Sequence, residues 1–578
     1  MRRPTWAKWL FITIASVVGL FLLLTLSLNF WIEPIVEQAA RVGLAQLSES
    51  GYRVDFQKLD LKPLRRQITL YDVTVSADSA QQSRLLAQGS YFTGQLDKLE
   101  LQLDKYPYWE SDKYLSISHL EIQHPYIQIH QSALAAEPEE DSSPLVTNTF
   151  TLIKPYLDSL RIMDINLQDG QITRILHDSS QVDTLKLPTV RLAIEDIRLD
   201  SLRALANNGL PTIKTWEMDA GVFRKVSKDS LYTYSIGSTH ADLIKGSLAF
   251  TDMQVHPNYE KKEFASHLSE QKDRMEVSVH SLELDGLQIL RLLHGKPLLA
   301  RTMAVDSITL SIFKDKRFPR NTAHKPLLQT MLHSIPVMFQ IDTILLTSGQ
   351  IVYEEQNGIS EEAGQVVFDQ LYATLYGATN NPEATNMFQV DTRANLMSDG
   401  LLEVSFQIPL GSSDGTHYIS GRLDRMHLER LNQLLEPVAF ASVRSGVANL
   451  LDFKMKLNDQ QATGDLRFIY NDLKVDILNQ DDPDNPALKA LLGTWLANWF
   501  VVKADNPTRS QPLRVGNIYF EHDATRSVFS YWCHALLSGI KESIGIPVPE
   551  NPTASIENPS EEPEKPGLLK RIFGQNEN

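Results

Sequence analysis

Residues that could do chemistry are few and widely spaced in this chain of 578 residues. His119, His124 and His130 form the densest set of potential metal ligands. They fall in a stretch with strand-like alternation and have mixed parity, so their side chains should point to different faces of a sheet. The sequence therefore predicts that these histidines do not converge on one metal ion.

The acidic and thiol residues form no recognisable catalytic set either. Glu139-Glu140 and Glu354-Glu355 stand in polar contexts, where solvated surface is expected. Residues 481–484 are rich in aspartate but lack the spaced ligands and the glycine of a calcium loop. The single cysteine, Cys533, lies in an apolar helical pattern, which indicates a packed side chain. Because phosphate-loop, zinc-helix and nucleophile-elbow motifs are missing, we expect no enzymatic activity, catalytic residue, metal or cofactor.

Composition narrows the remaining function classes. Hydrophobic residues make up 42% and charged residues 22% of the chain, which is typical of a folded protein. The formal net charge of −16 argues against a nucleic-acid partner, since such proteins usually present a basic face. One cysteine also excludes an internal disulfide framework.

One hydrophobic pattern recurs along the chain and indicates what it builds. With Φ for an apolar residue, the pattern is Φ-x-x-Φ-x-Φ, usually followed by a further apolar or small residue. Because the Φ-x-Φ pair has a period of two, its side chains lie on one face of a β-strand. The fullest copies are Phe56/Leu59/Leu61/Leu64, Ile117/Leu120/Ile122/Pro125, Ile162/Ile165/Leu167/Gly170, Val279/Leu282/Leu284/Leu287, Val305/Ile308/Leu310/Phe313 and Ile341/Ile344/Leu346/Gly349.

A membrane anchor is predicted close to the N-terminus. Residues 9–32 carry no charge, and a helix of that length reaches about 36 Å, enough to span a bilayer. Basic residues precede the stretch and acidic ones follow it, so the positive-inside rule places the N-terminus in the cytoplasm. The alternative is a cleaved signal peptide, but the apolar run is long and no small-x-small cleavage site follows it.

The expected compartment follows from the anchor, from the lack of usable glycosylation sites and from the near-absence of cysteine. Every Asn-x-Ser/Thr match in the chain has proline in the middle, which blocks glycosylation, and cysteine is almost absent. We therefore expect a single-pass protein of the bacterial inner membrane, with a cytoplasmic N-terminus and most of the chain in the periplasm.

The expected fold is mainly β: a transmembrane helix, then an elongated, twisted antiparallel β-sheet or groove, with a few amphipathic helices near the C-terminus. Helical spacing predicts a helix over 528–544 and short helices over 325–332 and 426–435, and Asn471-Asp472 predicts a turn. The expected segments are a cytoplasmic tail at 1–8, the anchor at 9–32, a juxtamembrane helix at 33–51, a first β-groove segment at 52–132, an acidic flexible loop at 133–150, the main β-groove body at 151–480, a helix-strand-helix cap at 481–546 and a disordered tail at 547–578.

Four stretches carry a resemblance to a known family. Residues 50–64 and 67–75, directly after the anchor, contain a Gly-aromatic-x-Val strand and an Ile-x-Leu-x-Asp-Val-x-Val strand. With 419–428 and 464–475, they resemble the AsmA-like proteins of Gram-negative envelopes. The resemblance implies a β-groove related to bridge-like lipid-transfer proteins. It also implies a role in moving phospholipid toward the outer membrane or in maintaining the envelope.

The apolar face of such a sheet must be covered, and the sequence leaves two ways open. In the first, phospholipid acyl chains cover it. In the second, protein covers the same residues, and the chain is a scaffold or assembly factor that recruits envelope proteins through its sheet edges. The predicted lipid-binding residues are Leu120, Ile122, Ile165, Leu167, Leu310, Ile312, Ile344 and Leu346.

Overall fold

The computed structural model describes residues 51–87, 89–105, 114–132, 158–177, 182–200, 212–289, 296–357, 362–478 and 502–546, and isolated positions at 34, 37, 38, 41 and 360. The protein is mainly β, with 61% strand and 13% helix, as the sequence predicts. The chain divides into two compact units. Unit 1 is Met1–Asn321, Gln329–Ser398 and Gln407–Gly411, and unit 2 is Thr322–Leu328, Asp399–Phe406 and Ser412–Asn578.

Several predicted segments fall outside the described residues. They include the anchor at 9–32, the acidic loop at 133–150 and the tail at 547–578. The isolated positions 34, 37, 38 and 41, within the predicted juxtamembrane helix, are helical. Among the described residues, no helix is both long and apolar enough to cross a membrane.

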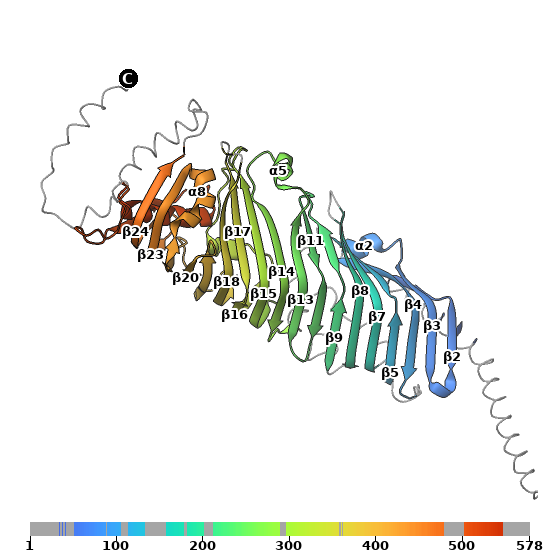
Figure 1. Ribbon diagram of the computed structural model, residues 1–578. Helices are drawn as coiled ribbons and strands as arrows, with labels where there is room; N and C mark the ends of the chain where they lie inside the picture. Colours follow the sequence, from blue (N-terminus) through green and yellow to red (C-terminus); the bar gives the residue numbers. More distant parts are fainter. Residues whose placement is uncertain are drawn as a thin grey trace, which may run out of the picture. The chain divides into compact units, whose positions relative to one another are not determined.

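Unit 1 is a sheet of long strands (Figure 1). Several of the long strands each pair with two shorter strands that follow one another in the chain. Its short helices are η2 (Pro63–Arg65), α2 (Gln82–Ala87), α5 (Lys261–Phe264), η3 (Ala265–His267) and α7 (Leu328–His333). Its strands are β1 (Tyr52–Asp55), β2 (Lys58–Lys62), β3 (Gln67–Ala77), β4 (Ser90–Leu103), β5 (Tyr114–Gln123), β6 (Tyr126–Ser132), β7 (Ser159–His177), β8 (Val182–Asp200), β9 (Thr215–Ala220), β10 (Phe223–Val226), β11 (Tyr232–Ile236), β12 (Ser238–Asp242), β13 (Ser247–Pro257), β14 (Arg274–Asp285), β15 (Leu298–Asp315), β16 (Phe339–Leu346), β17 (Gly349–Gln356), β18 (Gly364–Thr379) and β19 (Met387–Leu396).

The sheet is mixed, which corrects the prediction of a purely antiparallel one. Most neighbours are antiparallel, but β5 and β6 run parallel to β7, and β15 runs parallel to β16 and β17. A parallel pair needs a long crossover, and residues 316–338 between β15 and β16 supply one of them. The residues that join β6 to β7 lie almost entirely outside the described ones. The sequence pattern did not reveal this, because the alternation of side chains is the same in both strand directions.

Left-handed residues inside the strands explain the Φ-x-x-Φ spacing. Ser307, with φ 54°, stands between Val305 and Ile308 in β15. One such bulge residue shifts the alternation by one, so apolar side chains before and after it face the same side. Across Asp72, for example, Val73 joins one buried cluster with Leu59. The other left-handed residues inside strands of unit 1 are Asp169, Thr189, Asp196, Asp252 and Gln370.

Glycine occupies the same place in both parallel pairs. Gly170 in β7 stands three residues after Leu167, and Gly349 at the start of β17 stands three residues after Leu346. A Cβ on Gly170 would lie 2.7 Å from Leu167 Cδ2, and one on Gly349 would lie 3.0 Å from Ile308 Cγ2. The shared Gly-Gln-Ile sequence therefore marks the site where the apolar face bends and has no room for a side chain.

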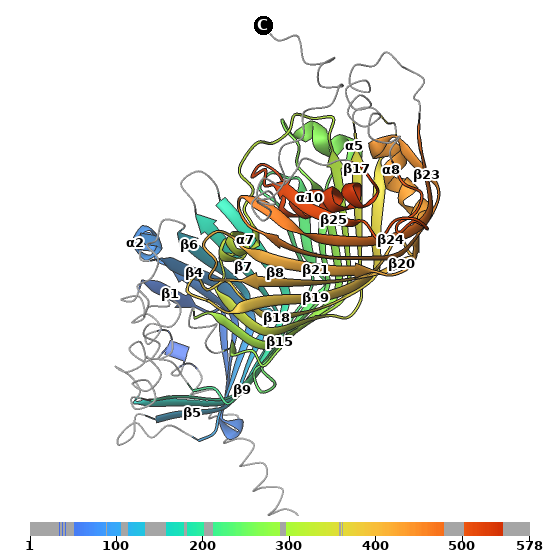
Figure 2. The ribbon, with the colours of Figure 1, turned by 90° about the vertical axis from the view of Figure 1, so that its left-hand side faces the viewer.

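Unit 2 is a smaller sheet with a helix packed on it. Its helices are η4 (Leu428–Leu431), α8 (Asn432–Ala439) and α10 (Val528–Ser543), and α10 confirms the helix predicted over 528–544. Figure 2 shows α10 along β25 and β24, which it contacts. The strands are most of β20 (Gly400–Pro409), then β21 (His417–Leu423), β22 (Met426–His427), β23 (Ala441–Leu457), β24 (Gln461–Ile477) and β25 (Val515–Glu521).

Three local predictions need correction. The turn predicted at Asn471-Asp472 is wrong, because β24 continues through it with Asp472 as another left-handed bulge, φ 53°. The helix predicted over 325–332 begins only at Leu328. The one predicted over 426–435 starts as strand β22 and becomes helical at Leu428.

A buried histidine fastens α10 to the sheet of unit 2. His417 is 0% exposed, and Trp532 Nε1 on α10 donates a hydrogen bond of 3.0 Å to its Nε2. The other ring nitrogen, Nδ1, lies 2.9 Å from the Gly415 carbonyl oxygen. Burial lowers the pKa of His417, and the nearby His522 lowers it further, so the folded protein holds the ring neutral.

The lowered pKa of His417 leads us to expect that unit 2 becomes less stable in acid. The folded pKa of this histidine lies below the ordinary value of about 6.5, so the unfolded state binds the extra proton first and stability falls as the pH drops. We expect urea unfolding of unit 2 to need less denaturant at pH ~5.5 than at pH ~7.5. His417→Gln should reduce this pH dependence, whereas His427→Gln, an exposed control, should leave it in place. An unchanged pH slope in His417→Gln would refute the assignment.

Candidate functional site

One face of unit 1 carries apolar residues in register from β2 to β19. Neighbours in register on adjacent strands share a face, so these residues form a continuous row across the sheet. Leu59, Ala241 and Leu284 are buried, and the other members are half-buried. We call this set the apolar row: Leu59, Leu70, Leu99, Ile122, Leu167, Leu192, Met218, Ala241, Leu248, Leu284, Met303, Ile344, Leu375 and Val390.

A second run of apolar residues follows the same face beyond the bulges. It joins β13 to β19 through residues that are again in register. Its members are Val255, Val277, Leu310, Ile351, Phe368 and Leu396. The apolar face is therefore wider than a single line of side chains.

The structure places all eight predicted lipid-binding residues on this face. Leu120 pairs with Ile165, and Ile122 pairs with Leu167. Leu310 and Ile312 follow the bulge of β15, and Ile344 and Leu346 lie on the adjacent β16. All eight are half-buried.

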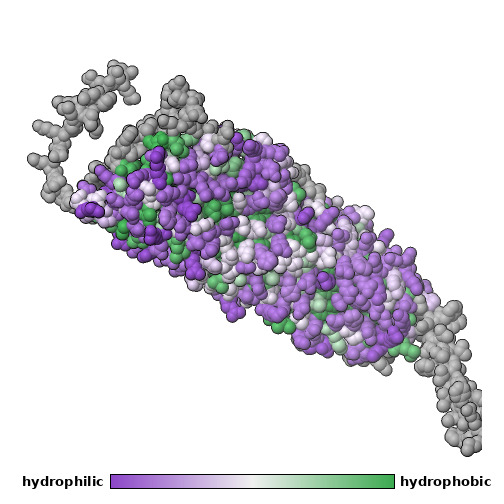
Figure 3. Space-filling view, in the orientation of Figure 1, coloured by the Kyte–Doolittle hydropathy of each residue, from purple (hydrophilic) through white to green (hydrophobic). Residues whose placement is uncertain are grey.

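The opposite face of the same strands is polar. In β8, Arg191, Ala193 and Glu195 are exposed and alternate with the half-buried Leu192 and Ile194. The side of β3 to β8 that is turned to the viewer in Figure 3 is mostly hydrophilic. The two faces therefore meet different surroundings.

Protein covers part of the apolar face. Leu287 and Ile289, which follow β14, are each 5% exposed and pack with Leu284, Ala300 and Ile341. Ile344 and Met303 lie partly buried against this cluster. The chain itself thus covers some of the row here. It does so again at β2 to β4, where Leu59, Leu70 and Leu99 pack in one cluster with the buried Phe56.

Unit 2 shows what full coverage by protein looks like. Leu466 and Ile518 of its sheet, and Tyr531 and Ala535 of α10, are all 0% exposed. Half-buried row members such as Leu167, Leu192 and Leu375 in unit 1 lack this degree of burial. The dry-core alternative therefore describes unit 2 well and unit 1 less well.

A group of charged residues lies at the edge of the apolar face. Asp183 Oδ2 is 2.7 Å from Lys225 Nζ, and both side chains are partly exposed. The hydrogen bond from Lys225 lowers the pKa of Asp183, against the effect of burial, and the charges of Lys228 and Arg174 lower it further. We call these four residues the rim cluster; the sequence analysis did not identify it.

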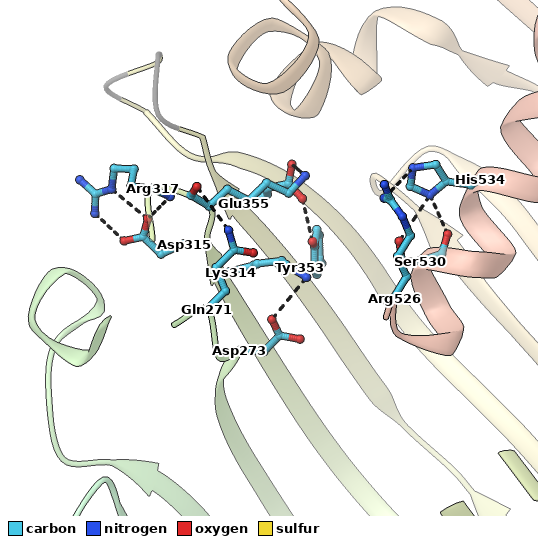
Figure 4. Close-up of polar contacts among 11 residues, drawn as sticks. Gln271, Asp273, Lys314, Asp315, Arg317, Tyr353, Glu355, Arg526, Ser530 and His534 are labelled. Atoms are coloured by element: carbon cyan, nitrogen blue, oxygen red, sulfur yellow. Dashed lines mark hydrogen bonds and ion pairs between the residues drawn. The ribbon is translucent and has the colours of Figure 1, made fainter. Parts of the chain in front are cut away.

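Other polar residues form satisfied ion pairs. Glu355 was predicted at the solvated surface, but it is 7% exposed, lies 2.5 Å from Lys316 Nζ and accepts a hydrogen bond from Tyr353 (Figure 4). Asp315 is also buried, which raises its pKa, but hydrogen bonds from Arg317 outweigh this and the pKa lies below its ordinary value. Pairing at the strand ends, which the sequence did not reveal, lets these carboxylates be buried.

The histidines do not gather into one site. His119 pairs with Asp164, His124 Nδ1 lies 3.0 Å from Asp97, and His130 Nδ1 lies 3.0 Å from His177 Nε2. Within the described part of the chain, no group of three or more side chains is placed to hold a metal ion. In chemical terms, the described site offers apolar surface with charge at its edge.

No protein-family model and no curated protein sequence matches this chain. The resemblance to AsmA-like proteins thus rests on the residues quoted for it and stays a prediction.

Proposed function

We propose that this protein binds phospholipid along the apolar face of unit 1. We further propose that it does so as an AsmA-like protein, anchored in the inner membrane with its bulk in the periplasm, and that it supports lipid transport or envelope maintenance. The observation that carries the proposal is the apolar row, which continues across the sheet while most of its members stay half-buried.

The energetics favour an acyl chain as the occupant. Burying one CH₂ group is worth about 0.8 kcal/mol, so a chain laid on the row gains with every carbon it covers. This hydrophobic gain does not depend on how the acyl chain is oriented, and the row offers similar apolar side chains on each successive strand. A lipid could therefore shift from one strand to the next with little change in free energy.

The charge at the edge of the face favours an amphiphile over a protein segment. The rim cluster places cationic groups beside half-buried apolar residues. A phospholipid has the matching arrangement, with a phosphate at one end and hydrocarbon at the other. The second candidate, a scaffold with a dry core, is supported by the Leu287 cluster, which also takes in Trp216 of β9 and Leu248 of β13, and by the Phe56 cluster at β2 to β4. The row members between these clusters, such as Ile122, Leu167 and Leu192, stay half-buried.

A face-specific cross-link tests the proposal in the full-length chain. We expect a benzophenone amino acid at Leu192 to form lipid adducts in native membranes upon irradiation. The same group at Ala193, the next residue and on the polar face, should form few. Intact mass measures the adduct. Equal labelling at the two positions, or protein cross-links alone at Leu192, would contradict lipid binding.

A further inference from the structure

Charged side chains of the rim cluster share the apolar face of unit 1. In β8, Asp183, Leu185 and Leu187 are half-buried, while Thr184 and Lys186 between them are exposed, so Asp183 continues the apolar side.

The two cationic strand residues of the cluster lie on this side as well. Arg174 is in register with Leu185 on one side and Ile129 on the other. Lys225 is in register with Tyr234, which in turn pairs with Val255 of the apolar face. Three neighbouring strands thus bring charge to one place at the edge of an apolar surface.

The cluster carries an excess of positive charge. Three cations surround one carboxylate, so its formal charge is 3 − 1 = +2, in a chain whose net charge is −16. The adjacent Asp229 is engaged with Lys272, 3.3 Å away. Arg174 Nε donates to Gln131 Oε1 at 2.8 Å, and this neutral partner does not offset its positive charge. An anion at this position would therefore be attracted.

The spacing along β7 suits a phospholipid. Arg174 stands seven residues beyond Leu167 of the apolar row, about 23 Å along a strand. The hydrocarbon of one bilayer leaflet is about 15 Å thick, half of the 30 Å core. A lipid whose phosphate contacts the cluster could thus lay its whole acyl chain on the strip between Arg174 and Leu167.

We propose that the rim cluster binds the phosphate of a phospholipid headgroup and so positions the lipid whose chains lie on the apolar row. This inference rests on the proposed function and adds the site that would hold the headgroup, which favours lipids that carry phosphate over neutral glycerides. Arg174 supplies a planar guanidinium, which can bind phosphate through two parallel hydrogen bonds, and Lys225 and Lys228 supply point charges.

The test uses the full-length protein with a benzophenone amino acid at Leu187, between the cluster and the row. We expect wild-type adducts to be mainly phosphate-containing lipids. Arg174→Gln with Lys225→Gln should lower these adducts about tenfold or more, because charge-assisted bonds are lost. The matched control, Lys186→Gln with Arg224→Gln, removes two exposed cations from the polar face of β8 and β10 and should change little.

The outcomes separate the two proposals. Phospholipid adducts that persist undiminished in the Arg174/Lys225 variant would overturn the headgroup site while leaving lipid binding intact. No lipid adduct in any protein would overturn both. Titration with inorganic phosphate tests whether the cluster is instead a site for free phosphate. In that case wild type would bind phosphate and the Arg174/Lys225 variant would not, while both would give equal lipid adducts. The headgroup proposal would then fail.

Discussion

Leu167→Asp is expected to remove nearly all lipid from the centre of the apolar row while the protein stays folded. Leu167 lies in register with Ile122 and Leu192, so the new carboxylate would stand in the path of any acyl chain on this face. Keeping a charge in contact with hydrocarbon costs far more than about 1.4 kcal/mol, which is a factor of ten in binding. Lipid adducts at a benzophenone on Leu192 should fall at least about tenfold.

The matched control is Asn166→Asp, which adds the same charge one residue away on the polar face. It should keep its adducts. Because Leu167 is half-buried, the midpoint of thermal unfolding of the protein should shift little in either variant. Global unfolding by Leu167→Asp would instead show that protein covers this residue. Ile344 is less suited to the experiment, since it packs against the Leu287 cluster and its replacement would disturb that cluster as well.

Gly516→Ala is expected to destabilise unit 2 severely. A Cβ at this position would lie 1.9 Å from the carbonyl oxygen of Gly539, so α10 could no longer lie against β25. Tyr531 and Ala535 of α10, both 0% exposed, would lose packing as the helix moves away. We expect a loss of about 3 kcal/mol or more in the free energy of unfolding, measured with urea and by hydrogen exchange of the α10 amides.

Val515→Ala serves as the control, because Val515 precedes Gly516 in β25 and is 49% exposed. Its effect should stay within about 0.5 kcal/mol. A Gly516→Ala protein as stable as wild type would mean that α10 does not approach β25 as closely as described.

The strands of this fold could be predicted from the sequence, but the reason for the Φ-x-x-Φ spacing between their apolar residues could not. The Φ-x-Φ pairs at Ile165/Leu167 and Ile344/Leu346 predict strands with one apolar face, and both pairs lie in strands. The preceding or following x-x step looked like a gap between strands. In the structure it often holds one left-handed residue, such as Asp169 or Ser307, inside a continuous strand. Aspartate adopts the left-handed conformation more readily than most residues, so Asp72, Asp169, Asp196 and Asp252 at this step are the signal that could have revealed these bulges.

Strand direction and long-range pairing could not be predicted. Alternation is identical in parallel and antiparallel strands, so nothing local distinguishes β15–β16 from β14–β15. The burial of Glu355 depends on Lys316, 39 positions away, and so does not follow from its neighbours. Contacts between distant segments decide both features.

The candidate site was only partly accessible from sequence. Phase along each strand places Ile122 and Leu167 on an apolar face, but their register with Leu192 emerges only from the pairing. The same holds for Ile344 and Leu375. Asp183 is in phase with Leu185 and Leu187, which is a signal of an unusual charge on the apolar side. Its surroundings of Arg174 and Lys225 come from neighbouring strands.

The most direct test of the account asks whether lipid occupies the row over its length. Benzophenone groups at Leu192 in β8 and Leu375 in β18 probe two distant members, and Ala193 and Tyr376 are their neighbours on the polar face. Tyr376 is 45% exposed, so its group would be free to react with any bystander lipid. If lipid occupies the row, we expect lipid adducts at Leu192 and Leu375 and few at Ala193 and Tyr376. Adducts at all four positions alike, or at neither row position, would contradict it.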